Sequence, residues 1–179
     1  DEIETIKKEI DDMLREIKRE VERSKEEIDR ALKRIREEVK KSEEEIDKAL
    51  EELRRNGVPE EILRKIEELL RRLKDEHRKL LERIEEVLRR LKRRHDKLLE
   101  DAERLLRELK EELDRNKDKS EEIIKRLLEK IRREARKVKE LIRTSNEEVR
   151  KRLKDLEELI RKSHEDVRRT LETLERETR

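Results

Sequence analysis

This sequence of 179 residues contains no cysteine, no aromatic residue, one glycine (Gly57) and one proline (Pro59). Without cysteine the chain can form no disulfide, no thiolate zinc site and no cysteine nucleophile. A strand-rich fold needs many sharp turns, and one Gly with one Pro supply only one or two. No apolar run approaches the ~20 residues of a membrane span. The acidic segment DEIETIKKEI at the N-terminus does not resemble a signal peptide. These absences leave a protein of long helices, or a disordered chain.

The spacing of the apolar residues favours helices over disorder. Charged residues make up 60% of the sequence, but 55 Lys and Arg nearly balance 53 Asp and Glu, which gives a net charge of +2. The apolar residues recur at steps of three and four, and the pattern repeats every 18 residues, or five helical turns. A period of 3.6 residues per turn matches the relaxed α-helix, so we predict nearly straight helices with little superhelical twist. The first helix shows this spacing at Ile3, Ile6, Ile10, Met13, Ile17, Val21, Ile28, Ala31, Ile35, Val39, Ile46, Ala49 and Leu53.

The first interruption of the pattern lies at residues 55–61. Gly57 suits the left-handed position that follows a helix, and Val58 can then pack back on Leu53. Pro59 suits the first position of the next helix. The sequence therefore predicts that one helix ends near residue 55 and that another begins at residue 59.

The second interruption lies at residues 115–121. We expect Asn116 to take the left-handed conformation here. Asp118, with Glu121 three residues later, is typical of a capping box, and Ser120 is an alternative N-cap. The sequence thus predicts an all-α fold: an antiparallel up-down-up bundle of three long, nearly straight helices at about 2–55, 59–115 and 119–177. We expect residues 1–179 to form a single domain, because the connections are short.

The register of the bundle follows from residue numbers, since facing residues of antiparallel helices have a constant sum. A sum of 119 for the first two helices pairs Leu53 with Ile66 and Leu14 with Leu105. A sum of 240 for the second and third helices pairs Leu69 with Leu171. Nearly every apolar residue finds an apolar partner. We therefore expect a monomer, and a very stable one, because roughly fifteen aliphatic layers would be buried.

The same two sums place polar residues together within the apolar faces of the three helices. Ser24, His95 and Ser145 fall in one layer, and Ser42, His77 and Ser163 fall in another, 18 residues away on each helix. A neutral imidazole has one donor and one acceptor nitrogen, so a hydroxyl on each side can satisfy it. We predict two buried Ser-His-Ser hydrogen-bond layers. The adjacent Asn146 and His164 either extend these layers or are simply boundary residues.

Other chemistry is less well supported by the sequence. A Ser–His pair can act as nucleophile and base, but no Asp or Glu at a core position could orient the imidazole. A metal needs three or four good ligands, and His77 with His164 is the only conceivable pair. Nucleic-acid binding needs a basic face, whereas opposite charges alternate here at i,i+4 spacing. We predict no catalytic residue, no cofactor, no metal ligand, no nucleic-acid site and no membrane segment.

Taken together, the 18-residue period, the short NGVPEE and NKDKSEE connections, the aliphatic core and the Glu/Lys/Arg surface resemble computationally designed helical bundles with buried hydrogen-bond networks. The resemblance covers the whole chain and implies a structural scaffold without an evolved ligand. One alternative is an interaction module that binds a further helix or a second copy, in a groove lined by Asn146, His164, Ile142 and Ile160. A second alternative is a bundle that responds to pH through its histidines. We expect a soluble protein, cytoplasmic on recombinant expression; the sequence does not identify a compartment.

Overall fold

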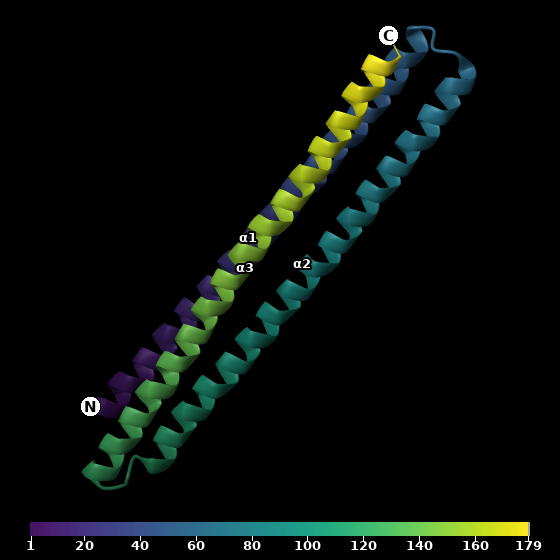
Figure 1. Ribbon diagram of the computed structural model, residues 1–179. Helices are drawn as coiled ribbons and strands as arrows, with labels where there is room; N and C mark the ends of the chain where they lie inside the picture. Colours follow the sequence, from purple (N-terminus) through teal and green to yellow (C-terminus); the bar gives the residue numbers. More distant parts are fainter. Residues whose placement is uncertain (179) are drawn as a thin grey trace. The chain divides into compact units, whose positions relative to one another are not determined.

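The computed structural model describes residues 1–178, and nearly all of them are helical (Figure 1). The helices are α1 (Glu2–Arg55), α2 (Glu60–Asn116) and α3 (Glu121–Glu177), and residues 1–178 contain no strand. Each helix contacts both others, so the prediction of an all-α three-helix bundle is confirmed. Within the same residues, no helix is long and apolar enough to cross a membrane.

The end of α1 has the predicted geometry. Gly57 has a φ of 72°, in the left-handed region. The amide of Val58 donates to the carbonyl of Leu53 at 3.4 Å, and the amide of Gly57 donates to the carbonyl of Arg54 at 3.3 Å. These two bonds form a Schellman motif, which satisfies carbonyl groups at the end of α1. Pro59 is the N-cap of α2, because its carbonyl accepts the first helical bond, from Leu63, at 2.9 Å and the helix begins at Glu60. The prediction that Pro59 is the first helical residue is therefore wrong by one position.

The connection between α2 and α3 differs from the prediction. No residue other than Gly57 has a positive φ in the described part of the chain, so Asn116 is not left-handed. Asn116 is the last residue of α2, and its side-chain amide donates to the carbonyl of Glu112 at 2.7 Å. Ser120 precedes α3 and its carbonyl accepts from Ile124 at 3.0 Å. Ser120 is therefore the N-cap, and the predicted capping box of Asp118 with Glu121 is wrong because Glu121 is the first helical residue.

The three helices contribute to two compact units. The first unit comprises Asp1–Glu27 and Arg90–Lys151, and the second comprises Ile28–Arg89 and Arg152–Arg179. Each unit contains one stretch of α1, one of α2 and one of α3, and each includes one of the two connections. The expectation of a single domain over residues 1–179 stays a prediction.

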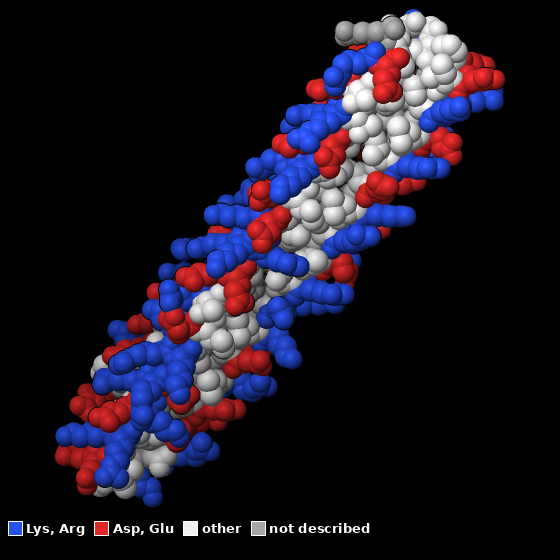
Figure 2. Space-filling model, in the orientation of Figure 1, with Lys and Arg blue, Asp and Glu red and all other residues white. Residues whose placement is uncertain are grey.

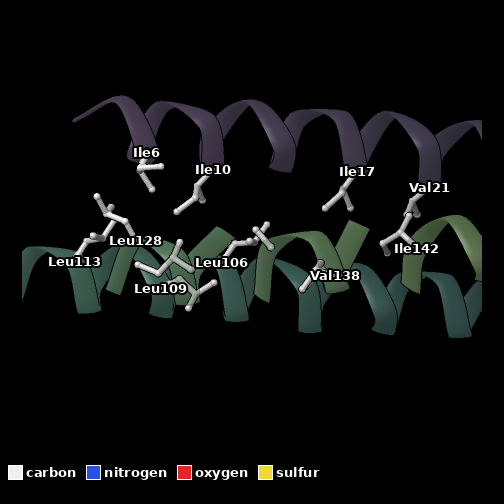
Figure 3. Close-up of a cluster of buried hydrophobic side chains, with 13 residues drawn as sticks. Ile6, Ile10, Ile17, Val21, Leu106, Leu109, Leu113, Leu128, Val138 and Ile142 are labelled. Atoms are coloured by element: carbon white, nitrogen blue, oxygen red, sulfur yellow. The ribbon is translucent and has the colours of Figure 1, made fainter. Parts of the chain in front are cut away.

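In the first unit, aliphatic side chains from the three helices interdigitate. Figure 3 shows Ile6, Ile10 and Ile17 of α1 pointing toward side chains of α2 and α3. Ion pairs between helices define the directions. Four pairs between α1 and α2 have residue numbers that add to 121, which requires antiparallel helices: Lys7–Asp114, Lys110–Asp11, Lys18–Glu103 and Lys25–Asp96. Two pairs between α1 and α3 differ by 123, which requires parallel helices: Lys139–Glu16 and Arg150–Glu27.

The second unit has the same internal arrangement. Its core includes Ile46 and Leu53 of α1, Ile66 and Leu70 of α2, and Val167 of α3. Here too the α1–α2 ion pairs add to 121, as in Arg36–Glu85, Lys74–Asp47, Arg78–Glu43 and Arg54–Glu67. The α1–α3 pairs Arg34–Glu157 and Arg168–Glu45 differ by 123. Within each unit, therefore, α2 is antiparallel to α1 and α3 is parallel to α1.

One detail of the predicted core is wrong. Leu69 was expected to face Leu171 in the core, but it is 42% exposed, while the next residue, Leu70, is completely buried. The same holds for Leu105, which is only partly buried beside the completely buried Leu106. Constant sums locate a facing pair only to within one residue, so they cannot decide which of two adjacent leucines points at the bundle axis.

Candidate functional site: the buried polar side chains

The first buried polar pair joins α1 to α2 in the first unit. Ser24 and His95 replace apolar residues at positions of the 18-residue stripe, so the helices turn both side chains inward. The Oγ atom of Ser24 lies 2.7 Å from the Nε2 atom of His95, and the histidine is only 1% exposed. The Nδ1 atom of His95 is buried and has no hydrogen-bond partner. Ser145, the third predicted member of this layer, is therefore not bonded to the ring.

The second buried polar pair joins α2 to α3 in the second unit. The Nδ1 atom of His77 lies 2.7 Å from the Oγ atom of Ser163, and His77 is 2% exposed. Ser42 is completely buried, but its Oγ atom and the Nε2 atom of His77 both lack a partner. The prediction that each histidine bonds at least one of its serines is confirmed. Each predicted triad, however, is only half formed, and each histidine links α2 to a single neighbour.

Burial lowers the pKa of both imidazoles, because a charged ring loses its hydration inside an aliphatic core. For His77 the positive charge of His164 lowers the pKa further, while the nearby carboxylates of Glu43 and Glu38 oppose the shift. For His95 the carboxylate of Asp96 opposes the effect of burial and Lys25 adds to it. Both shifts favour the neutral form, which is the form that can accept a hydrogen bond from serine.

His164 forms a third polar site that sequence reasoning did not identify. It is 2% exposed and lies between two carboxylates of α1: its Nδ1 atom contacts Glu38, and its Nε2 atom lies 3.0 Å from Glu45. Carboxylates only accept hydrogen bonds, so both contacts are satisfied only when both ring nitrogens carry protons. His164 is thus bonded to carboxylates of α1 rather than to the serines and histidines of the two layers, and at 2% exposure it is not a boundary residue either.

Arg168 completes this charged cluster. It lies one helical turn after His164, and its guanidinium donates to both oxygens of Glu45 at 3.2 and 3.4 Å. Partial burial raises the pKa of Glu45, but the hydrogen bonds from Arg168 and His164 outweigh this effect and hold the pKa below its ordinary value. The signal in the sequence was the seven-residue spacing of Glu38 and Glu45, which places both carboxylates on one face of α1, two turns apart.

Asn146 joins neither polar layer. Its side chain is partly buried, and its Oδ1 atom has no hydrogen-bond partner. The groove that we expected to be lined by Asn146, His164, Ile142 and Ile160 is not open, because His164, Ile142 and Ile160 are all buried. That placement of an interaction surface is wrong for these three residues: Ile142 is buried in the first unit, and Ile160 and His164 are buried in the second.

The chemistry available to these side chains is limited by their enclosure. The hydroxyls of Ser24 and Ser163 each contact an imidazole, and both histidines are almost completely buried. Both nitrogens of His164 are occupied by carboxylates. Among residues 1–178, no group of three or more His, Asp or Glu side chains could hold a metal ion. What the polar side chains can do is link helices in one register and change charge with pH.

The chain is thus, by its fold, an all-α three-helix bundle with buried Ser–His hydrogen bonds. No protein-family model matches the sequence, and comparisons with curated proteins and with solved structures find no similar chain.

Proposed function

We propose that this chain is a structural scaffold of the designed helical-bundle type, in which buried Ser–His hydrogen bonds specify how the helices pair. The observation that carries the proposal is the presence of two such bonds, Ser24–His95 and His77–Ser163, at positions otherwise occupied by aliphatic residues. The first links α2 to α1 and the second links α2 to α3, so together they involve all three helices. On this proposal the chain needs no substrate, cofactor or metal.

The physical reason is that aliphatic layers alone specify register weakly. Sliding α2 by one turn would still match leucines with isoleucines, since nearly every turn offers one. The same slide would separate Ser24 from His95 and bury both without a partner. Each unpaired buried group costs about 1–3 kcal/mol. A polar pair therefore adds little to the stability of the correct arrangement but penalises the wrong ones, a role that buried polar residues have in some helical bundles.

The experiment compares the parent with a variant in which the polar pairs are replaced by aliphatic residues of similar size, Ser24→Ala, His95→Leu, His77→Leu and Ser163→Ala. We expect the variant to resist denaturant at least as well as the parent, because hydrophobic replacement of buried polar groups is often neutral or stabilising. We also expect it to lose uniqueness, with several oligomeric species in light scattering and broadened amide resonances. A variant that stays monodisperse with equally sharp resonances would contradict the proposed role.

The burial of His77 and His95 favours a second candidate, a bundle whose stability responds to pH. Burial lowers the pKa of both rings and so favours their neutral form. Protonation of either ring opposes its burial, so acid should destabilise the fold. Measuring the free energy of unfolding against pH, as described in the Discussion, tests this candidate.

A further inference from the structure

In the second unit, some edges between helices are charged and another is aliphatic. Where α1 meets α2 or α3, the edges carry ion pairs between helices, such as Arg78–Glu43 and Arg34–Glu157. The interhelical ion pairs described above for this unit all involve α1. An edge that faces water is normally charged, whereas an aliphatic edge normally packs against another element. The boundary between α2 and α3 is an aliphatic edge of this kind.

Large aliphatic side chains are exposed along this boundary. Ile62 and Leu69 of α2 are 47% and 42% exposed, and Leu159 of α3 is 46% exposed. Lys74 reaches α1 from one edge of α2, and Leu69 lies on the opposite edge, which faces α3. Leu159 lies one turn before Ser163, the residue of α3 that contacts His77. In the upper part of Figure 2, uncharged atoms form a band between α2 and α3 that is bordered by charged side chains.

We call this surface the α2–α3 seam and define it by Ile62, Leu69 and Leu159, with the partly buried Leu73 and Leu80 between them. From residue 62 to residue 80 it follows α2 for about 27 Å at 1.5 Å per residue. A single amphipathic helix of about 20 residues matches this length. Such a helix, laid between α2 and α3, would cover the exposed leucines as a fourth helix covers two others in a four-helix bundle.

Charge along the seam indicates what kind of helix fits. The solvent-facing edge of α2 beside Leu69 carries three basic side chains and one acidic one, all exposed: Lys65, Arg72, Arg83 and Glu76. Lys65 and Arg83 form no ion pair in the described part of the chain. The corresponding edge of α3 is balanced, with Arg152, Lys162, Asp155 and Asp166. A second copy of the chain would bring the same basic edge, so an acidic helix is the better complement.

We propose that the α2–α3 seam of the second unit binds an amphipathic helix of another chain, with Leu or Ile on its buried face and Glu or Asp on the edge beside α2. Apolar side chains that repeat with the i, i+3, i+4 and i+7 spacing along the whole of that helix contact Ile62, Leu69 and Leu159, as in other helix-in-groove complexes. Its acidic edge lies beside Lys65 and Arg83. This binding is independent of the Ser–His pairs and of the proposed scaffold role.

The test uses two labelled synthetic peptides of about 21 residues, long enough to span the seam as helices. Both carry the same leucine stripe; one has Glu and the other has Lys at the flanking positions. Fluorescence anisotropy with the full-length chain at low salt should show tighter binding of the Glu peptide by about tenfold or more, with the difference reduced at high salt. Equal affinity for the two peptides would overturn the charge assignment.

Two double variants and one single control variant locate the site. Leu69→Glu with Leu159→Glu should weaken binding of the Glu peptide by at least about tenfold, because charged side chains would then face its leucines. Leu141→Glu is the matched control, since Leu141 is exposed but belongs to the first unit. Lys65→Glu with Arg83→Glu should reverse the preference in favour of the Lys peptide. Circular dichroism must show parent-like helicity and melting in each variant, as expected for changes at exposed positions.

Other outcomes contradict the proposal. Binding that survives Leu69→Glu with Leu159→Glu, or that Leu141→Glu weakens as strongly, places the peptide elsewhere. Sedimentation of the parent chain alone tests whether a second copy of the chain occupies the seam. If the parent dimerises at low micromolar concentration and Leu69→Glu with Leu159→Glu makes it monomeric, the seam binds a second copy, and the assignment to an acidic helix is wrong.

Discussion

His77 in α2 is bonded through Nδ1 to the hydroxyl of Ser163 in α3 at 2.7 Å, whereas Ser42 of α1, in the same predicted layer, has an unpaired buried hydroxyl. The two serines therefore have opposite energetic roles. Ser163 satisfies a buried ring nitrogen, and Ser42 buries a polar atom that has no hydrogen bond.

We predict that Ser163→Ala lowers the free energy of unfolding by about 1–3 kcal/mol, because it leaves Nδ1 of His77 unpaired. Ser42→Ala should be neutral or stabilising, because it removes a buried hydroxyl that makes no hydrogen bond. Guanidinium unfolding of both variants at pH 7.5 measures the difference. Equal losses in the two variants would show that both serines bond the ring, as the sequence alone had suggested.

Acid should weaken the bundle through His77 and His95. Burial holds the pKa of each ring below its ordinary value of 6.5. The unfolded chain then binds more protons than the folded chain as pH falls below 6.5, so stability is highest above that pH and is lost on the way down to the folded pKa. Each unit of difference corresponds to about 1.4 kcal/mol. The measurement is guanidinium unfolding at about pH 7.5 and about pH 5.0.

The control for this experiment is a variant with His77→Leu and His95→Leu. It should lose clearly less stability than the parent between these two pH values. The carboxylates of Glu43 and Glu45 have lowered pKa values, so their contribution is present above 4.5 and is lost only as pH falls further. If parent and variant weaken equally by pH 5.0, the two histidines are not held neutral in the fold.

We expect unequal losses of stability when two neighbouring glutamates near His164 are replaced. Glu45→Gln removes a carboxylate that contacts the buried ring of His164 and accepts from Arg168, and it should cost about 1–3 kcal/mol, as hydrogen bonds to charged groups do. Glu43→Gln is the matched control, because the hydrogen bonds of Glu43 come from the exposed Arg78, and such surface pairs contribute at most about 1 kcal/mol. Chemical denaturation at pH 6 measures both. A larger loss for Glu43→Gln would refute the special role of His164.

Replacing Gly57 should change the free energy of unfolding through backbone conformation alone. Its φ of 72° is strained for any residue with a Cβ atom, although no atom lies within 4 Å of where that Cβ would be. We expect Gly57→Ala to lower the free energy of unfolding by about 1–2 kcal/mol, the cost of the left-handed conformation. Gly57→Asn should cost less, because Asn tolerates this region better. Thermal unfolding followed by circular dichroism compares the two; an Ala variant as stable as the parent would contradict the Schellman geometry.

Much of the fold was predictable from local signals in the sequence. The spacing of residues such as Ile6, Ile10 and Ile17 determines where each helix buries its stripe, because side-chain direction repeats every 3.6 residues. Gly57 could be placed because the left-handed end of a helix strongly prefers glycine. Asn116 misled the prediction because asparagine also fits a helix end whose carbonyl its own amide can satisfy, as it does with Glu112.

The polar site was predictable only in part. Residue sums brought His95 beside Ser24 and His77 beside Ser163, and both contacts are present. They could not decide between the two serines that flank each ring, because a rotation of the side chain by one rotamer exchanges one partner for the other.

The sequence by itself determined the number of helices, the positions of both connections and the register of the layers to within one residue, because each depends on periodicity along the chain. Only the tertiary structure decided that Leu70 is buried while Leu69 is exposed, since that depends on how far each helix is rotated about its axis. Only the tertiary structure brought His164 between Glu38 and Glu45, because electrostatic partners on parallel helices are selected by distances in space that no spacing along one helix specifies.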